Sequence, residues 1–266
     1  MNNAAAYWHV VKAASKEDRA NPARLLVSIG AGVARMVLIA AIYKVAYDVS
    51  GAAALPYANA IWSMGLYFAF IMGLGLRNVF RLAEKDVVTG NVEVSIVKPL
   101  DWRLVKVCQL IGRNGIESLA MMVAFTITLL VLVGIPDASF MTWQFLIGYV
   151  VLVILGIVTA SALYLTIGLA AFWLNDAKSV FRIVDKFVMI FGGAFVPLAL
   201  LPDVVQTVVR YSPFGVYGAV TQLFNPGLLT HLIPTLIAGI FWSVVMLATC
   251  QFIWHKAQQR IEVNGG

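Results

Sequence analysis

The segment that decides the fold of this chain is residues 77–113, with the sequence RNVFRLAEKDVVTGNVEVSIVKPLDWRLVKVCQLIGR. It is the one long polar stretch in an apolar chain, and it carries seven Lys/Arg against four Asp/Glu. Because it lies between two hydrophobic runs, we expect a loop on one side of a membrane. Its basic excess indicates the cytoplasmic side. A long loop in a protein with little other polar mass is most simply a docking surface.

The composition is that of a membrane protein. The 266 residues are 61% hydrophobic and 12% charged, with a mean hydropathy of +0.87, whereas soluble domains are about 45–50% apolar and about 25% charged. Long apolar runs satisfy their backbone hydrogen bonds as helices, and these runs are too long and too little alternating for barrel strands. The sequence therefore predicts one all-α polytopic membrane domain over residues 1–266.

Six hydrophobic runs predict six transmembrane helices. They are Leu25–Val49, Pro56–Leu76, Gly115–Ile135, Phe140–Leu174, Phe187–Leu201 and Leu232–Trp254. In the second run, Gly65, Ala69 and Gly73 recur every four residues, a stripe that lets helices pack closely in lipid. Of the 19 Lys/Arg, 16 fall on the predicted inner side, so both termini are expected in the cytoplasm.

Three segments outside the spans have their own predicted form. Residues 1–24 fit an interfacial amphipathic helix broken at Asn21–Pro22, with a disordered polar tail as the alternative. Residues 202–231 are apolar in part but interrupted by Pro and Gly, which favours a re-entrant hairpin on the outer side. In the cytoplasmic loop, apolar residues alternate at 92, 94 and 96; since a lone strand lacks partners, we expect a short surface helix, with a solvated loop as the alternative.

The net charge of +6 does not indicate nucleic-acid binding, because the basic residues sit at span ends as topology signals and lipid contacts. One cation differs: Arg35 lies inside the first span. Two explanations stay open: it faces a cavity or a partner subunit, or the helix starts later and the side chain reaches the inner interface.

Catalytic chemistry is not indicated. The sequence has no GxxxxGK[ST] loop and no HExxH motif. No Cys/His pair has ligand spacing, so we expect no metal. No Ser/His/Asp set or paired membrane aspartates appear either. We therefore expect a transport subunit rather than an enzyme, whose energy comes from another protein.

Two motifs resemble a known family. VTGNVEVSIVKPLDWRL at 88–104, with Gly90 and Lys98–Pro99–Leu100, is similar to a cytoplasmic stretch of type 2 ABC transporter permeases. The segment 192–224, GGAFVPLALLPDVVQTVVRYSPFGVYGAVTQLF, resembles the end of their fifth span and their re-entrant hairpin. With six spans and inside termini, the resemblance covers nearly the whole chain.

The resemblance implies a partnership. Two permease subunits, identical or different, would pack together in a bacterial cytoplasmic membrane, and each would dock a cytoplasmic ABC ATPase that carries ATP and Mg. This chain would bind neither cofactor. The coupling helix would span 84–99, its charges pairing with the ATPase and its apolar residues seating in a groove. The coupling residues are Glu84, Asp86, Val87, Val88, Gly90, Val92, Ile96, Lys98 and Pro99.

The resemblance also implies a translocation path between the first, second and fifth spans, near Arg35, Asn59, Trp62, Met64, Phe191, Phe195 and Pro197. The apolar, aromatic-rich spans favour export of a hydrophobic or amphipathic substrate. The alternatives are a polysaccharide or glycolipid exporter permease, a non-transporting scaffold or regulatory subunit, and a membrane enzyme.

Overall fold

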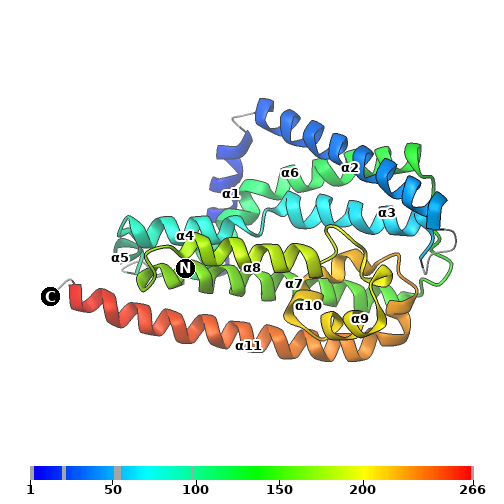
Figure 1. Ribbon diagram of the computed structural model, residues 1–266. Helices are drawn as coiled ribbons and strands as arrows, with labels where there is room; N and C mark the ends of the chain where they lie inside the picture. The colour runs from blue at the N-terminus through cyan, green and yellow to red at the C-terminus, as the bar shows by residue number, and fades with distance from the viewer. Residues whose placement is uncertain (1–2, 20–21, 51–54, 97–98, 265–266) are drawn as a thin grey trace.

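The computed structural model describes residues 3–19, 22–50, 55–96 and 99–264, which form helices and turns without a strand (Figure 1). Within them, four helical stretches are long and apolar enough to cross a membrane: Leu25–Val49, Trp102–Leu132, Trp143–Phe172 and Gly227–Arg260. They belong to α2 (Pro22–Ser50), α6 (Trp102–Leu132), α7 (Trp143–Leu169, continued by η2, Ala170–Phe172) and α11 (Gly227–Asn264). The prediction of an all-helical membrane protein is confirmed.

The second predicted span is a short, buried helix. It consists of α3 (Tyr57–Leu66) followed by η1 (Tyr67–Met72), a π-helix. As predicted, its small-residue stripe packs closely on another helix, and the structure identifies that helix as α6. A Cβ on Gly65 would lie 2.5 Å from Leu129 Cδ1, and one on Gly73 would lie 2.9 Å from Ser118 Cα. The Ser118 hydroxyl also donates to the Ala69 carbonyl at 3.2 Å.

The polar segment folds into helices rather than an open loop. After a turn at Gly75 (φ +61°) come α4 (Asn78–Val88) and α5 (Asn91–Ile96), separated by Gly90 (φ +73°). A short helix is thus confirmed at α5. The single coupling helix expected over 84–99 does not form, because the turn at Gly90 divides it between the end of α4 and α5. The helix of the third predicted span, expected from Gly115, already begins at Trp102 as α6. Asp101 caps it by accepting from the backbone N–H groups of Arg103 and Leu104.

The fifth predicted span, Phe187–Leu201, does not form one helix. Helix α8 spans Ala177–Phe191, and only the short turn η3 (Leu198–Leu200) follows before the chain reaches residue 202. Gly193 has φ +89°, a conformation that ends a helix, and Pro197 lacks the N–H to continue one. Instead, the helix begins ten residues earlier, inside the predicted loop, because Asp176 caps it through the Ser179 N–H.

The segment predicted as a hairpin contains three short helices, α9 (Asp203–Arg210), α10 (Pro213–Tyr217) and η4 (Gly218–Gln222). It packs tightly on α7, where a Cβ on Gly156 would lie 2.7 Å from the Val216 carbonyl oxygen. Helices α9 and α10 lie at the end of the molecule opposite to α4 and α5 (Figure 1). Re-entry into a membrane leaflet stays a prediction.

The N-terminal helix α1 (Asn3–Arg19) packs on α6. A Cβ on Gly112 would lie 2.3 Å from the Val11 carbonyl oxygen, and the Asp101 N–H donates to the Tyr7 hydroxyl at 3.0 Å. Helix α2 then starts at Pro22, which confirms the predicted break. Position at the membrane surface stays a prediction. Both termini lie in the half of the molecule that holds α4 and α5 (Figure 1).

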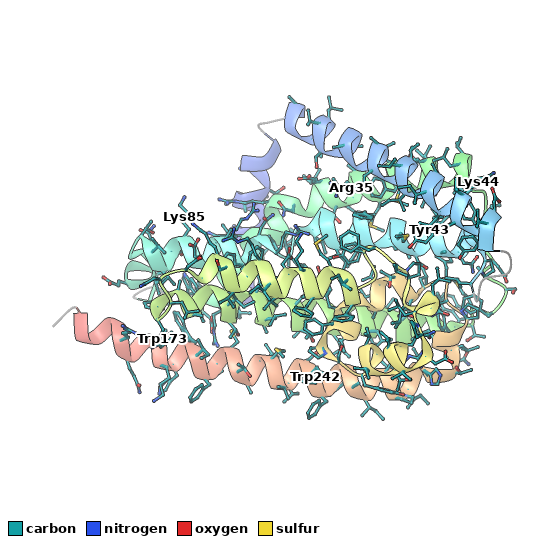
Figure 2. The ribbon with its side chains drawn as sticks, in the orientation of Figure 1. Arg35, Tyr43, Lys44, Lys85, Trp173 and Trp242 are labelled. Atoms are coloured by element: carbon teal, nitrogen blue, oxygen red, sulfur yellow. The ribbon has the colours of Figure 1, made fainter. Side chains whose placement is uncertain are left out.

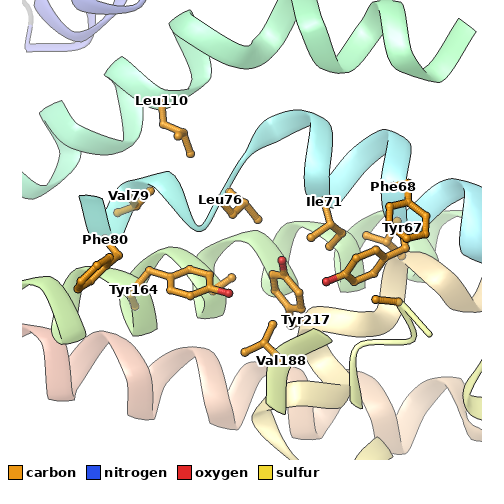
Figure 3. Packing of buried hydrophobic residues seen from close by; sticks show 14 of the residues in the cluster. Tyr67, Phe68, Ile71, Leu76, Val79, Phe80, Leu110, Tyr164, Val188 and Tyr217 are labelled. Carbon is orange, nitrogen blue, oxygen red and sulfur yellow. The ribbon is translucent and has the colours of Figure 1, made fainter. Parts of the chain in front are cut away.

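The core joins η1, α7, α8 and α10 around three buried tyrosines, Tyr67, Tyr164 and Tyr217 (Figure 3). The Tyr164 hydroxyl donates to Asp185 Oδ1 at 3.0 Å, and Arg77 lies 3.7 Å from Asp185 Oδ2. A buried carboxylate is stable only when it is paired and hydrogen-bonded, so this ion pair fixes α8 against the turn that follows η1.

Candidate functional site

The predicted coupling segment is built around α4, which lies in a close-fitting seat. Val79, Phe80 and Ala83 are buried. Phe80 stacks on Phe181 of α8 with ring centroids 4.2 Å apart. A Cβ on Gly168 of α7 would lie 2.6 Å from Ala83 Cβ. Helix α4 is therefore packed closely on α7, and its Phe80 ring contacts α8.

Asp86, predicted to pair with a partner protein, points into the chain. Its Oδ2 lies 2.5 Å from Lys106 Nζ and accepts from Trp102 Nε1 at 3.0 Å. The two charged side chains are only 14% and 9% exposed. Trp102 in turn stacks on Trp254 of α11, with ring centroids 5.1 Å apart and planes 2° from parallel. This cluster, Asp86–Lys106–Trp102–Trp254, ties the C-terminal end of α4 to α6 and α11.

Glu84, the second predicted partner contact, is also engaged within the chain. It lies 3.4 Å from Lys178 Nζ, and its side chain is 15% exposed against 66% for the lysine. A pair with one member in water contributes little to stability. The pair affects the surface charge instead. Both acids of α4, Glu84 and Asp86, point toward neighbouring helices, so the exposed charges of α4 are basic.

A surface hollow of about 560 Å³ opens between α4 and the start of α8, and we call it the basic hollow. Four basic side chains line it against two acids, and phenylalanine rings form its floor. Lys85 projects outward at this end of the molecule (Figure 2). The lining residues are Phe80, Arg81, Glu84, Lys85, Asp176, Lys178, Phe181 and Arg182.

Asp176 at the rim of the basic hollow stays ionised. Hydrogen bonds from the Ser179 hydroxyl and backbone N–H lower the pKa of Asp176 below its ordinary value. In the sequence, Lys178 and Arg182 count only among the 16 basic residues of the predicted inner side. The pattern gave no sign that they lie beside α4, because a count of basic residues does not say which helices meet.

The other predicted coupling residues divide between surface and core. Val88 is 70% exposed and Pro99 is exposed, whereas Val92 is buried and Val87 packs against the core. A Cβ on Gly90 would meet no atom within 4 Å. The backbone of Ile96 ends α5, and Lys98 lies outside the described residues.

Three of the residues predicted near a translocation path are buried inside the chain. Asn59 donates to the carbonyl oxygens of Asp137 and Phe224 at 3.0 and 2.9 Å. Trp62 Nε1 donates to the Gly134 carbonyl at 2.9 Å, and Met64 is 1% exposed. These contacts join α3 to the loops around it.

The remaining path candidates lie nearer the surface, except for buried Pro197. Arg35 is exposed on α2, with its guanidinium carbon 5.5 Å from the centroid of the Phe68 ring (Figure 2). Phe195 is 52% exposed, and its carbonyl accepts from the Tyr43 hydroxyl at 2.6 Å. Phe191 is half-buried and packs on Phe214. The path itself stays a prediction.

A comparison with protein families finds one match that covers nearly the whole chain. The model described as ABC-2 family transporter protein matches residues 29–265. Among curated proteins, none matches this chain. Within the described residues, no group of three His, Cys, Asp or Glu is placed to hold a metal ion.

Proposed function

This chain belongs to the ABC-2 transporter family, and we propose that it is the permease subunit of an ATP-driven exporter in a bacterial cytoplasmic membrane. A separate cytoplasmic ATPase would bind ATP and Mg and supply the energy. Two permease subunits, identical or different, would form the membrane part of the complex. Members of the family are membrane subunits that lack an ATPase site of their own.

We propose six crossings, made by α2, α3 with η1, α6, α7, α8 and α11. Sixteen residues in α3 and η1, and fifteen in α8, rise only about 24 and 22 Å at about 1.5 Å per residue. Both are shorter than a hydrocarbon core of about 30 Å. The chain beyond them, at Gly75 and at Gly193, is buried among other helices. Non-helical backbone is tolerated at membrane depth where protein covers it.

The observation that carries the proposal is the basic hollow beside an anchored helix. Arg81, Lys85 and Arg182 offer exposed positive charge around phenylalanine rings. Such a surface suits a protein partner with acidic side chains and an apolar anchor, because opposite potentials steer encounter and fix register. We place the docked ATPase there and across Val88.

Force applied to α4 would pass to the spans by contact. Gly168 leaves no space between α4 and α7, and the Asp86–Lys106–Trp102–Trp254 cluster ties α4 to α6 and α11. Closure of an ATPase dimer would therefore shift these helices together. Packed interfaces respond to such a push by switching between discrete arrangements. The substrate we propose is hydrophobic or amphipathic and passes beside Arg35 and Phe195.

A charge-reversal experiment tests the docking surface. The complex is purified through a tag on the permease, the co-purified ATPase is quantified, and ATP-dependent flux is measured in proteoliposomes. The double variant Arg81→Glu/Lys85→Glu should lose at least tenfold in bound ATPase and in flux. The control Lys44→Glu changes an exposed lysine at the other end of the molecule (Figure 2) and should retain both.

The outcomes separate the candidate functions. Full ATPase binding and flux in the double variant would refute docking at the basic hollow. ATPase binding without ATP-dependent flux in the wild-type complex would instead identify a scaffold or regulatory subunit. Restored binding when acidic residues of the ATPase are exchanged for basic ones would locate the partner surface.

A further inference from the structure

A second hollow, of about 450 Å³, opens between α6, α7 and α11 on the spans themselves. We call it the lateral groove. Its walls are aliphatic and include Val107 of α6, Ile157 and Leu165 of α7, and Leu247 of α11. It contains none of the residues of the basic hollow or of the predicted path. An apolar groove between membrane helices takes up lipid tails or an amphipathic molecule.

The mouth of the lateral groove is polar. Asp101, Arg103 and Gln251 line it at the end of α6 that, in the proposed orientation, faces the cytoplasm. The Arg103 guanidinium donates through Nε and one terminal nitrogen to Asp101 at 3.1 and 2.6 Å, and through the other terminal nitrogen to Gln251 at 2.5 Å. A guanidinium carries five N–H donors. The Cys250 sulfur also accepts from the Arg103 side chain, so these bonds leave one donor for a ligand.

A polar residue, Ser161, lies deeper in the groove. It lines the wall and is 94% buried, and its Oγ, closed off from solvent, has no hydrogen-bond partner among the residues that the structure describes. An unpaired buried hydroxyl is unfavourable, so a ligand group that accepts from it gains a hydrogen bond. Along α7, Ser161 lies about one turn further from the mouth than Leu165, and Ile157 lies another turn beyond.

This order of groups matches a phospholipid. We propose that the lateral groove binds one zwitterionic diacyl phospholipid of the cytoplasmic leaflet. The phosphodiester accepts from the remaining Arg103 donor, the ammonium lies beside Asp101, an ester carbonyl accepts from Ser161, and an acyl chain runs along Ile157 and Leu247. The inference uses the orientation of the proposed function, but not its ATPase.

The paired charges at the mouth favour a zwitterionic headgroup over an anionic one. Asp101 stays ionised beside Arg103, so a net negative headgroup would meet a carboxylate that it cannot neutralise. An ethanolamine headgroup offers one charge to each partner. A guanidinium N–H is also a strong donor to a phosphate oxygen, because both groups are charged.

Native mass spectrometry of the detergent-purified chain tests the proposal. The protein is delipidated and titrated with phosphatidylethanolamine or phosphatidylglycerol. The wild type should bind one phosphatidylethanolamine in preference to phosphatidylglycerol. Val158→Trp fills the groove and should abolish this binding. Ile154→Trp, one turn along α7 at an exposed position outside the groove, is the matched control and should retain it.

A smaller variant guards against misfolding. Ser161→Ala removes a single oxygen and should weaken binding about fivefold, the effect of one hydrogen bond. Equal lipid binding in Val158→Trp and Ile154→Trp, or no loss in Ser161→Ala, would overturn the site. Equal affinity for both lipids would overturn the headgroup contacts. Since no ATPase is present, failure here leaves docking at the basic hollow standing, and failure of docking leaves this result standing.

Discussion

The Asp86–Lys106 pair offers the sharpest test of how α4 is held. Asp86→Asn keeps the size of the side chain and an oxygen that can accept from Trp102 Nε1, but it removes the negative charge 2.5 Å from Lys106 Nζ. Lys106 is then left with its charge in a site where the side chain is 9% exposed. The exposed face of α4, which we propose as the docking surface, is unchanged.

Removing one partner from a buried ion pair costs about 3–5 kcal/mol. The hydrogen bond that asparagine retains places this variant at the lower end, about 3 kcal/mol. For a chain of this size, each kcal/mol shifts the midpoint of thermal unfolding by about 2–4 °C, so the expected decrease is about 6–12 °C. The measurement is thermal unfolding of the detergent-solubilised chain, followed by helical circular dichroism.

A double-mutant cycle isolates the pair. Lys106→Met removes the other charge at similar volume, and alone it strands Asp86. The double variant Asp86→Asn/Lys106→Met buries no charge, so it should be less destabilised than either single variant. In proteoliposomes, Asp86→Asn should retain ATPase binding and lose flux, because the docking face is intact while its link to α6 is broken.

Two results would refute this reasoning. Additive effects of the two substitutions would show that the residues do not interact in the folded protein. Flux at the wild-type level in Asp86→Asn, with stability lowered as expected, would show that force does not pass through this contact.

Three further predictions concern packing and pH. Gly168→Leu should displace α4, because a Cβ at Gly168 already lies 2.6 Å from an alanine of that helix, and the displacement should lower ATPase co-purification. The control Gly115→Leu, whose Cβ has no neighbour within 4 Å, should leave co-purification unchanged. Gly65→Leu overpacks α3 against α6 and should cost about 1–3 kcal/mol of unfolding free energy in detergent; unchanged stability would contradict the close approach. Burial raises the pKa of Asp101, but the guanidinium and backbone N–H groups beside it lower that pKa more, so the net pKa is below the ordinary value. The stabilisation by this cap is therefore complete above about pH 4 and is lost as pH falls further, so Asp101→Ala should cost about 1 kcal/mol at pH 7 and match the wild type in strong acid.

Local signals in the sequence predicted several elements. The Asn21–Pro22 break and the stripe of Gly65, Ala69 and Gly73 were recognisable because each is a pattern of nearby residues. The helix at 91–96 was expected against its local pattern, since residues 92, 94 and 96 alternate as in a strand and only the lack of a partner strand excluded that. The first span is confirmed at Leu25–Val49. Few residues of this helix are buried against the rest of the chain, so hydropathy was enough to predict its bounds.

The elements that the sequence misplaced depend on tertiary contacts. Helix α8 carries Lys178, Arg182 and Lys186, which read as loop because hydropathy does not show that one face of a helix is buried. Asp86 and Glu84 looked like surface acids, but their basic partners come from other helices. Because the two members of each pair lie far apart in the sequence, the sequence alone does not show that they meet.

The π-helix η1 makes the length of the second span a constraint in its own right. In an α-helix, positions four residues apart advance by about 40° around the axis, so a stripe at Gly65, Ala69 and Gly73 would drift off α6. The wider turn between Tyr67 and Met72 offsets that drift. Loss of one residue from α3 would rotate everything after it by about 100°, turning Gly75 and α4 away from their partners. Loss of one residue within the π-helix would instead restore a regular α-helix with little rotation, so the chain should tolerate a shorter second span only between Tyr67 and Met72.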